Sequence, residues 1–124
     1  MNDQEIEREL QAKGLNAPRI TPADLEAVIV SEHYFTAGDG VHGDALRDSA
    51  NEGRSVYPSS LDLLTFCVLV LKNGFTVTGK SACASPENFN AETGRKLARA
   101  NAINELWPLL GYQLKQRLFE ESRG

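Results

Sequence analysis

The sequence predicts a small α+β protein in which N-terminal helices, an antiparallel β-hairpin and a long, kinked C-terminal helix form a single domain of residues 1–124. Three observations support this fold class. The dipeptide Asn73-Gly74 separates two β-prone runs, which is the strongest short signal for a hairpin. Apolar residues recur at helical spacing after Asn90. A chain of 124 residues can also bury one modest core.

The composition is that of an ordinary soluble protein, with 41% hydrophobic and 24% charged residues. The formal net charge of −4 argues against coating of nucleic acid, which depends on many cationic side chains. It still allows a small cationic pocket for one anionic ligand. The polar, acidic start is unlike a signal peptide, and no apolar run approaches the ~20 residues that span a membrane. A cytosolic protein without membrane contact is therefore expected.

Two helices are expected near the N-terminus. Residues 1–20 form an extension with a short helix that Gly14 ends as a C-terminal cap. Thr21 is a typical N-cap residue for the second helix. The apolar spacing predicts that this second helix continues to about His33 or Tyr34.

Residues 37–60 are rich in glycine and polar side chains and are expected to form a long loop. A loop of this length in a compact domain is usually functional or disordered. Two interpretations remain open: a tolerated surface insertion, which is the more common case, and a flap over a ligand. Residues 63–119 then form the hairpin-helix core.

The turn sets the expected register of the hairpin. If Asn73-Gly74 is a two-residue turn, counting back places Cys67 opposite Lys80 and directs the Cys83 side chain to the other face. A disulfide is then not expected, and both cysteines are interpreted as reduced thiols. Two cysteines are also too few for a structural zinc site.

The first strand of the hairpin is apolar on both faces. The same register places Val68 and Val70 on the face of Val77, and Leu69 on the face of Thr78. A strand that is apolar on both faces needs cover on both sides, and a lone hairpin is marginally stable in water. Helices or a second subunit must supply this cover, so a homo-oligomer is expected.

The C-terminal helix begins near Asn90. Every fourth residue from Gly94 to Ala102 is small, which allows close approach of a strand or another helix. Pro108 cannot donate a backbone hydrogen bond to the preceding turn, so the helix should kink or break there.

Cations in the first turns of this helix are candidates for binding an anion. Arg95 and Arg99 share a helical face, where like charges are mildly unfavourable, and a helix N-terminus disfavours cations. An anionic ligand would offset both effects. The alternative is a solvated basic face with Glu92 nearby, which is the more common outcome for such residues.

The segment before the helix has two interpretations. Asn88 or Asn90 could cap the helix and Phe89 could act as a hydrophobic staple, which explains most of the segment. The functional alternative uses Phe89 to stack on a base while the amides bind the edge of that base.

Gly79-Lys80-Ser81 resembles part of a phosphate loop, but the required upstream glycine and following helix are missing. Gly79 instead suggests a bulge or a close backbone approach. Lys80, with Ser81 beside it, could still project towards a phosphate, although an exposed strand lysine is the default. No metal-ligand spacing, nucleophile elbow or acid–base pair is present, so no metal, cofactor or enzymatic activity is expected.

Three runs, LKNGFTVTGKSAC, ENFNAETGRKLARANAI and LWPLLGYQL, resemble a family of small tailed-phage proteins that includes the Thoeris anti-defence sponge proteins. Roughly 70 of the 124 residues take part, and the order of the motifs is specific. The matching positions are Lys72 to Phe75, Gly79, Ser81, Cys83, Asn88, Phe89, Gly94, Trp107 to Leu109, Gly111 and Tyr112. The segment from 38 to 60 is longer than the connection usual in the family.

The resemblance implies a viral protein of the host bacterial cytoplasm that counters immunity without catalysis. Such sponges sequester the cyclic ADP-ribose variant made by Toll/interleukin-receptor-type enzymes, and some hold cyclic oligonucleotides. They are homo-oligomers built from dimers, such as hexamers, with ligand sites at subunit interfaces. The alternatives are a phage accessory module that binds a host protein or nucleic acid, and a small hydrolase, for which no nucleophile or metal constellation is present.

In a sponge of this kind, an aromatic side chain stacks on adenine and arginines bind phosphates through forked donors. Phe89 or Tyr34 is expected to stack, and Arg95 and Arg99 are expected to bind phosphate. The candidate ligand-binding residues are Tyr34, Lys80, Ser81, Asn88, Phe89, Asn90, Arg95 and Arg99.

Overall fold

The computed structural model describes residues 2–15, 17–47 and 56–123. Its elements are α1 (Asp3–Ala12), α2 (Pro22–Val28), β1 (Ile29–Thr36), α3 (Ala37–Ala45), η2 (Ser59–Leu63), β2 (Leu64–Leu71), β3 (Thr76–Ala82), η3 (Pro86–Asn88) and α4 (Ala91–Arg123), where η marks a 3-10 helix. The strands form one antiparallel sheet in the order β1-β2-β3. The predicted α+β class, with N-terminal helices, a hairpin and a long C-terminal helix, is confirmed.

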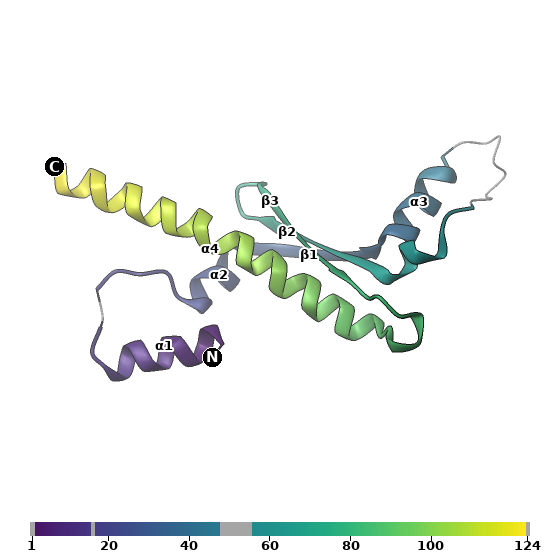
Figure 1. The fold of residues 1–124 in the computed structure, drawn as a ribbon. Coiled ribbons are helices and arrows are strands. Elements are labelled where there is room, and N and C mark those ends of the chain that lie inside the picture. The colour runs from purple at the N-terminus through teal and green to yellow at the C-terminus, as the bar shows by residue number, and fades with distance from the viewer. Residues whose placement is uncertain (1, 16, 48–55, 124) are drawn as a thin grey trace.

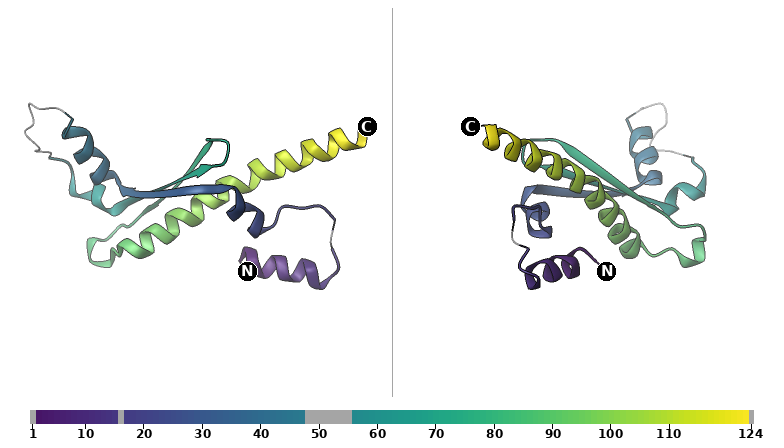
Figure 2. Two further views of the ribbon diagram at one scale, coloured as in Figure 1. Left: turned by 180° about the vertical axis from the view of Figure 1, so that it is seen from behind. Right: turned by 60° about the vertical axis from the view of Figure 1, so that its left-hand side comes forward.

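Helix α4 crosses one face of the sheet, and its C-terminal half extends beyond the sheet (Figures 1 and 2). The core lies between this helix, the covered face of the sheet and α2. Its buried members are Leu25, Cys67, Leu69, Leu71, Val77, Ala98, Ala102, Leu106 and Leu110. The α3 helix lies at the end of the molecule opposite the C-terminus (Figure 1).

The small-residue face of α4 packs directly on β3. Ala98 and Ala102 are buried, and a Cβ added at Gly79 would lie 2.1 Å from the Ala98 carbonyl oxygen and 2.2 Å from the Ala102 amide nitrogen. Only a residue without a side chain fits at this crossing. The close backbone approach expected at Gly79 is therefore confirmed.

Strand β1 was missed by the sequence prediction. The caps are as expected, since Gly14 has a φ of 70° after α1 and the Thr21 hydroxyl accepts a hydrogen bond from the Asp24 amide. However, α2 ends at Val28, so the predicted continuation to about His33 or Tyr34 is wrong. The following residues are mostly β-branched or aromatic, and they form the third strand by pairing with the free edge of β2.

The predicted loop over residues 37–60 is wrong at its start, because residues 37–45 form α3. The Thr36 hydroxyl accepts from the Asp39 amide at 3.0 Å, and the Asp39 carboxylate accepts from the Thr36 amide at 2.9 Å. This reciprocal capping box begins the helix despite its glycines. Residues 48–55 of the predicted loop lie outside the described residues.

The hairpin register differs from the prediction by one residue. The Leu71 amide donates to the Phe75 carbonyl at 2.8 Å, so the loop has three residues and closes with Gly74 at a φ of 89°. Cys67 consequently pairs with Gly79, and the predicted pairing with Lys80 is wrong.

This one-residue shift exchanges the faces of the hairpin. Leu69 pairs with Val77 beneath α4, whereas Val68 pairs with Thr78 on the opposite, largely uncovered face. Cys67 and Cys83 are both free thiols, as expected, although the opposite-face argument behind that expectation was wrong.

Helix α4 continues through Pro108 without ending, and its axis changes direction gently about midway along its length (Figure 1). The predicted alternative of a break at this proline is therefore wrong. Among the described residues, no helix combines the length and apolar character needed to cross a bilayer.

Candidate functional site

Two adjoining hollows lie at the start of α4, between the helix and the sheet. The amide hollow, of about 260 Å³, is lined by Ser81 from β3, by Asn88, Phe89 and Asn90, and by the first turn of α4. The arginine hollow, of about 100 Å³, is lined by Tyr34, Thr36, Asp39, Phe89, Ala91 and Arg95 among others. Phe89 and the buried Thr65 line both hollows, so the two are neighbours.

Six of the eight candidate residues therefore come together at the start of α4: Tyr34, Ser81, Asn88, Phe89, Asn90 and Arg95. The other two, Lys80 and Arg99, line other hollows.

Local capping builds the wall of the amide hollow. The Asn90 side-chain oxygen accepts from the Thr93 amide at 2.9 Å, so Asn90 is the N-cap of α4, and the capping interpretation is confirmed for this residue. The preceding 3-10 turn ends at Asn88 and leaves Phe89 half-buried between the two hollows. The Cys83 thiol also lines the amide hollow and donates to the Ser85 carbonyl at 3.2 Å.

Arg95 is exposed and makes no ion pair with the residues that the structure describes. The same hollow is lined by the Asp39 carboxylate, which accepts a hydrogen bond from the Thr36 amide. The guanidinium donors of Arg95 therefore remain available to an anion.

Arg99 is one helical turn further along, and each of its three guanidinium nitrogens donates to a carboxylate. Its Nη1 and Nη2 atoms donate to the two Glu26 oxygens at 3.0 and 2.7 Å, and its Nε atom donates to Glu32 Oε2 at 2.6 Å. These hydrogen bonds hold the pKa of Glu26 below its usual value and raise the pKa of Arg99. The arginine therefore joins α4 to α2 and β1.

Tyr34 links this ion-pair cluster to the arginine hollow. Its hydroxyl donates to Glu32 Oε2 at 3.2 Å, the same oxygen that accepts from Arg99. Burial raises the pKa of Tyr34 to about 12, and the neighbouring Cys67 and Glu32 side chains add to this effect. The phenol consequently remains a hydrogen-bond donor at neutral pH.

Lys80 is exposed on the uncovered face of the sheet and lines a different hollow. Its carbonyl accepts from the Asn101 side chain at 2.8 Å, but no ion pair joins its amine to a described residue. The structure therefore does not bring Lys80 to the other candidates.

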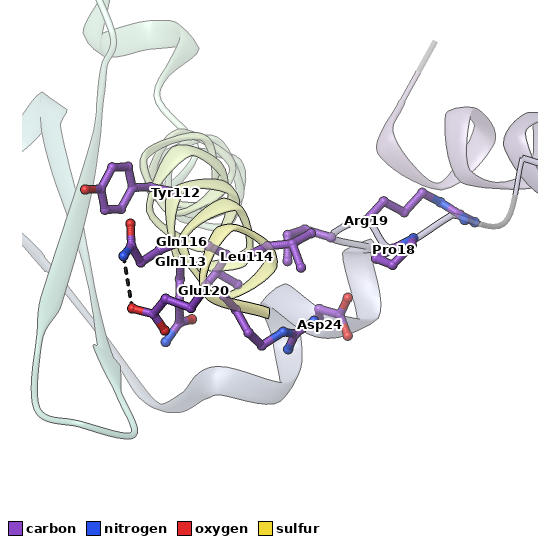
Figure 3. Close-up of a pocket in the computed structure, with 11 residues that line it drawn as sticks. Pro18, Arg19, Asp24, Tyr112, Gln113, Leu114, Gln116 and Glu120 are labelled. Carbon is purple, nitrogen blue, oxygen red and sulfur yellow. Dashed lines mark hydrogen bonds between the residues drawn. The ribbon is translucent and has the colours of Figure 1, made fainter. Parts of the chain in front are cut away.

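A further hollow of about 740 Å³ separates the segment from Pro18 to Asp24 from the second half of α4 (Figure 3). Several of its polar residues are already paired: Gln116 donates to Glu120 of the same hollow at 3.0 Å, and Arg19 pairs with Glu7. Figure 3 shows Tyr112 on the other side of the helix from Arg19. No candidate residue lines this hollow.

Sequence reasoning missed the acidic partners of Arg99 and the Asp39 carboxylate. The threonine and aspartate three positions apart at Thr36 were a usable capping signal for α3. No local signal could reveal Glu26 and Glu32, because they are 73 and 67 positions away from Arg99.

Comparison with known proteins gives one match. No curated protein and no solved structure matches the chain. The profile of a family of phage proteins matches residues 20–118, which include both hollows and every candidate residue. Because this match covers most of the 124 residues, the chain belongs to the phage protein (N4 Gp49/phage Sf6 gene 66) family.

Proposed function

We propose that this phage protein is a sponge, a non-catalytic binder that sequesters a cyclic nucleotide immune signal in the host bacterial cytoplasm. The ligand would be a cyclic ADP-ribose variant of Thoeris-type defence or a cyclic oligonucleotide. The observation that carries the proposal is the meeting of an aromatic ring, side-chain amides and a guanidinium, which has no ion-pair partner among the described residues, at the N-terminus of α4.

These groups match the parts of such a ligand. Phe89 stands between the two hollows and offers a stacking surface for adenine, while Asn88 offers an amide to the edge of the base. Arg95 and the first turn of α4 favour a phosphate on the other side of the ring. Tyr34, which lines the arginine hollow together with Phe89, is the second aromatic side chain that could contact the adenosine part of the ligand.

Binding in one chain would leave part of the ligand exposed. The two hollows measure about 260 and 100 Å³, at or below the lower end of the ~300–1,000 Å³ typical of small-molecule sites. We assign the remaining contacts to a second copy in a homo-oligomer. The uncovered sheet face, where Phe35 and Phe66 stack with ring centroids 5.5 Å apart, offers apolar surface for such assembly.

The same face supports the alternative function, an accessory module that binds a host protein. Phe35 is 39% exposed and Phe66 and Val68 are partly exposed. Clustered exposed apolar side chains are typical of protein interfaces. Binding of nucleic acid is not favoured, because the net charge is −4.

Retention of intact ligand tests the sponge directly. The protein is incubated with cyclic ADP-ribose variants and cyclic oligonucleotides, freed of unbound ligand by gel filtration, denatured by heat and analysed by chromatography. Recovery of intact ligand supports sequestration, and recovery of a cleaved product would indicate an enzyme. Absence of retained ligand would exclude the sponge and favour the protein-binding alternative.

Arg95→Ala provides the residue-level test. Loss of a charged hydrogen bond to phosphate should weaken binding about 10-fold or more, while this exposed position should leave the melting temperature nearly unchanged. Lys96→Ala is the matched control, because Lys96 is the next residue, carries the same charge and pairs with Glu92 at 3.3 Å. Equal affinity losses in both variants would indicate unspecific attraction and contradict the phosphate role.

A further inference from the structure

We infer that Arg99 is a positioning residue that orients Tyr34 in the ligand site through Glu32, and that it does not contact the phosphate. The inference rests on the proposed function, because it assigns Tyr34 to the wall of the same binding site. The four-residue spacing between Arg95 and Arg99 led us to expect that both bind phosphate, and the inference replaces that role for Arg99.

Each guanidinium nitrogen of Arg99 already donates a hydrogen bond to a carboxylate. Three of its nitrogen atoms lie 2.6 to 3.0 Å from oxygens of Glu26 and Glu32. Its side chain is 30% exposed, whereas those of Glu26 and Glu32 are 56% and 42% exposed. A phosphate at Arg99 would have to compete with two carboxylates that already hold the guanidinium in a forked, charge-assisted arrangement.

The contacts of Arg99 lead instead to the arginine hollow. Tyr34 and Glu32 are two residues apart on β1, so their side chains lie on the same face of the sheet, towards α4. The Tyr34 hydroxyl donates to the same Glu32 oxygen that Arg99 holds. The Tyr34 ring lines the hollow with Arg95, which is one helical turn before Arg99.

Loss of Arg99 should therefore loosen Tyr34 more than it unfolds the protein. Without Arg99, Glu32 is a partly exposed carboxylate that no other cation of the described residues holds, and the tyrosine loses a fixed acceptor. Exposed ion pairs contribute little to global stability, but an ordered ring in a binding site reduces the entropy lost on binding. Glu26, on α2, also holds the arginine in place, so α2, β1 and α4 together define the position of the Tyr34 ring.

Two probes separate positioning from direct phosphate contact. Adenosine has no phosphate, whereas cyclic ADP-ribose carries a pyrophosphate. Arg99→Ala should weaken both probes by a similar factor of roughly 2- to 10-fold, because the ordering of one side chain is lost. Arg95→Ala should weaken cyclic ADP-ribose alone. A loss for cyclic ADP-ribose with unchanged adenosine binding in Arg99→Ala would overturn the inference.

A measurement without ligand keeps the inference testable if no nucleotide binds. The chain has three tyrosines, and NMR of ring-labelled tyrosine, assigned with Tyr34→Phe, reports the Tyr34 environment at neutral pH. Arg99→Ala should move the Tyr34 signal towards that of a solvated tyrosine, Arg99→Lys should move it less, and Arg95→Ala should leave it in place. An unchanged Tyr34 signal in a folded Arg99→Ala protein would overturn the inference, whereas failure of the wild type to bind any nucleotide would reject only the proposed function.

Discussion

Replacement of Gly79 by alanine tests whether the close crossing of α4 over β3 holds the fold together. The added Cβ would lie 2.1 Å from the Ala98 carbonyl oxygen, 2.2 Å from the Ala102 nitrogen and 2.9 Å from the Ala102 Cα. Carbon atoms in protein interiors pack at about 3.5–4.0 Å. All three neighbours are backbone atoms of a helix interior, so no side-chain rotation can relieve the contact.

The helix must therefore move away from the sheet by roughly 1 Å or more to restore ordinary contact distances. Overpacking costs typically 1–3 kcal/mol, and a clash with rigid backbone belongs at the upper end of that range. We expect Gly79→Ala to lower the free energy of unfolding by about 3 kcal/mol. This is a large part of the ~5–15 kcal/mol that stabilises a typical domain.

Urea denaturation, monitored by far-ultraviolet circular dichroism, should show this loss as a lower midpoint. The dependence of the free energy of unfolding on urea concentration should be unchanged. Gly111→Ala is the matched control, because no atom lies within 4 Å of its added Cβ and a glycine in a helix interior is unfavourable by up to ~1 kcal/mol. The Gly111→Ala protein should be as stable as the wild type or more stable. If the free energy of unfolding of Gly79→Ala lies within about 0.5 kcal/mol of the wild-type value, the close crossing is refuted.

Three further predictions follow from the caps, the turn and the ion pairs. Asn90→Ala should lower stability by about 1 kcal/mol in urea titrations, whereas Asn88→Ala should not, because only Asn90 caps α4; equal effects would contradict the capping role. Gly74→Ala should destabilise by about 1–2 kcal/mol in the same assay because its φ is 89°, and a neutral result would refute this positive φ. The pKa of Glu26 is lowered in the folded protein, so its contribution is present above its unfolded pKa and is lost as pH falls through the folded value. The urea midpoint should therefore decrease less from neutral to acid pH in Glu26→Gln than in the wild type. An equal decrease in both proteins would show that the Glu26–Arg99 pair adds no stability.

The secondary structure could be predicted where a signal lies within a few residues. Thr21 and Asn90 both cap helices, and Gly14 ends α1 with a positive φ. Most of strand β1 was predicted as helix because it directly follows the helix start signals of α2, and no nearby sequence signal indicates its pairing with β2. In the hairpin, the turn sequence did not decide between a loop of two and a loop of three residues, so its faces were exchanged.

The candidate site shows the same division. Phe89, Asn88 and Arg95 are neighbours in sequence around a helix start, and they remain neighbours in space. Tyr34 joins them from a strand whose existence was not predicted, and Lys80 lies on the other face of the sheet. The sequence could predict that the residues of one short segment lie together, but it could not predict which side chains of the strands share a face of the sheet.

The sequence by itself determined the caps of α1, α2 and α4 and the presence of a hairpin, because each depends on the chemistry of one residue or its near neighbours. The need for a residue without a side chain at Gly79 arises from the packing of β3 against Ala98 and Ala102 of α4. Only the tertiary structure decided that Arg99 is bound to two carboxylates while Arg95 has no ion pair with any residue that the structure describes. On one helical face the two arginines are equivalent. The difference arises from Glu26 and Glu32, which are 73 and 67 positions distant from Arg99 and reach it only when α2 and β1 pack beside α4.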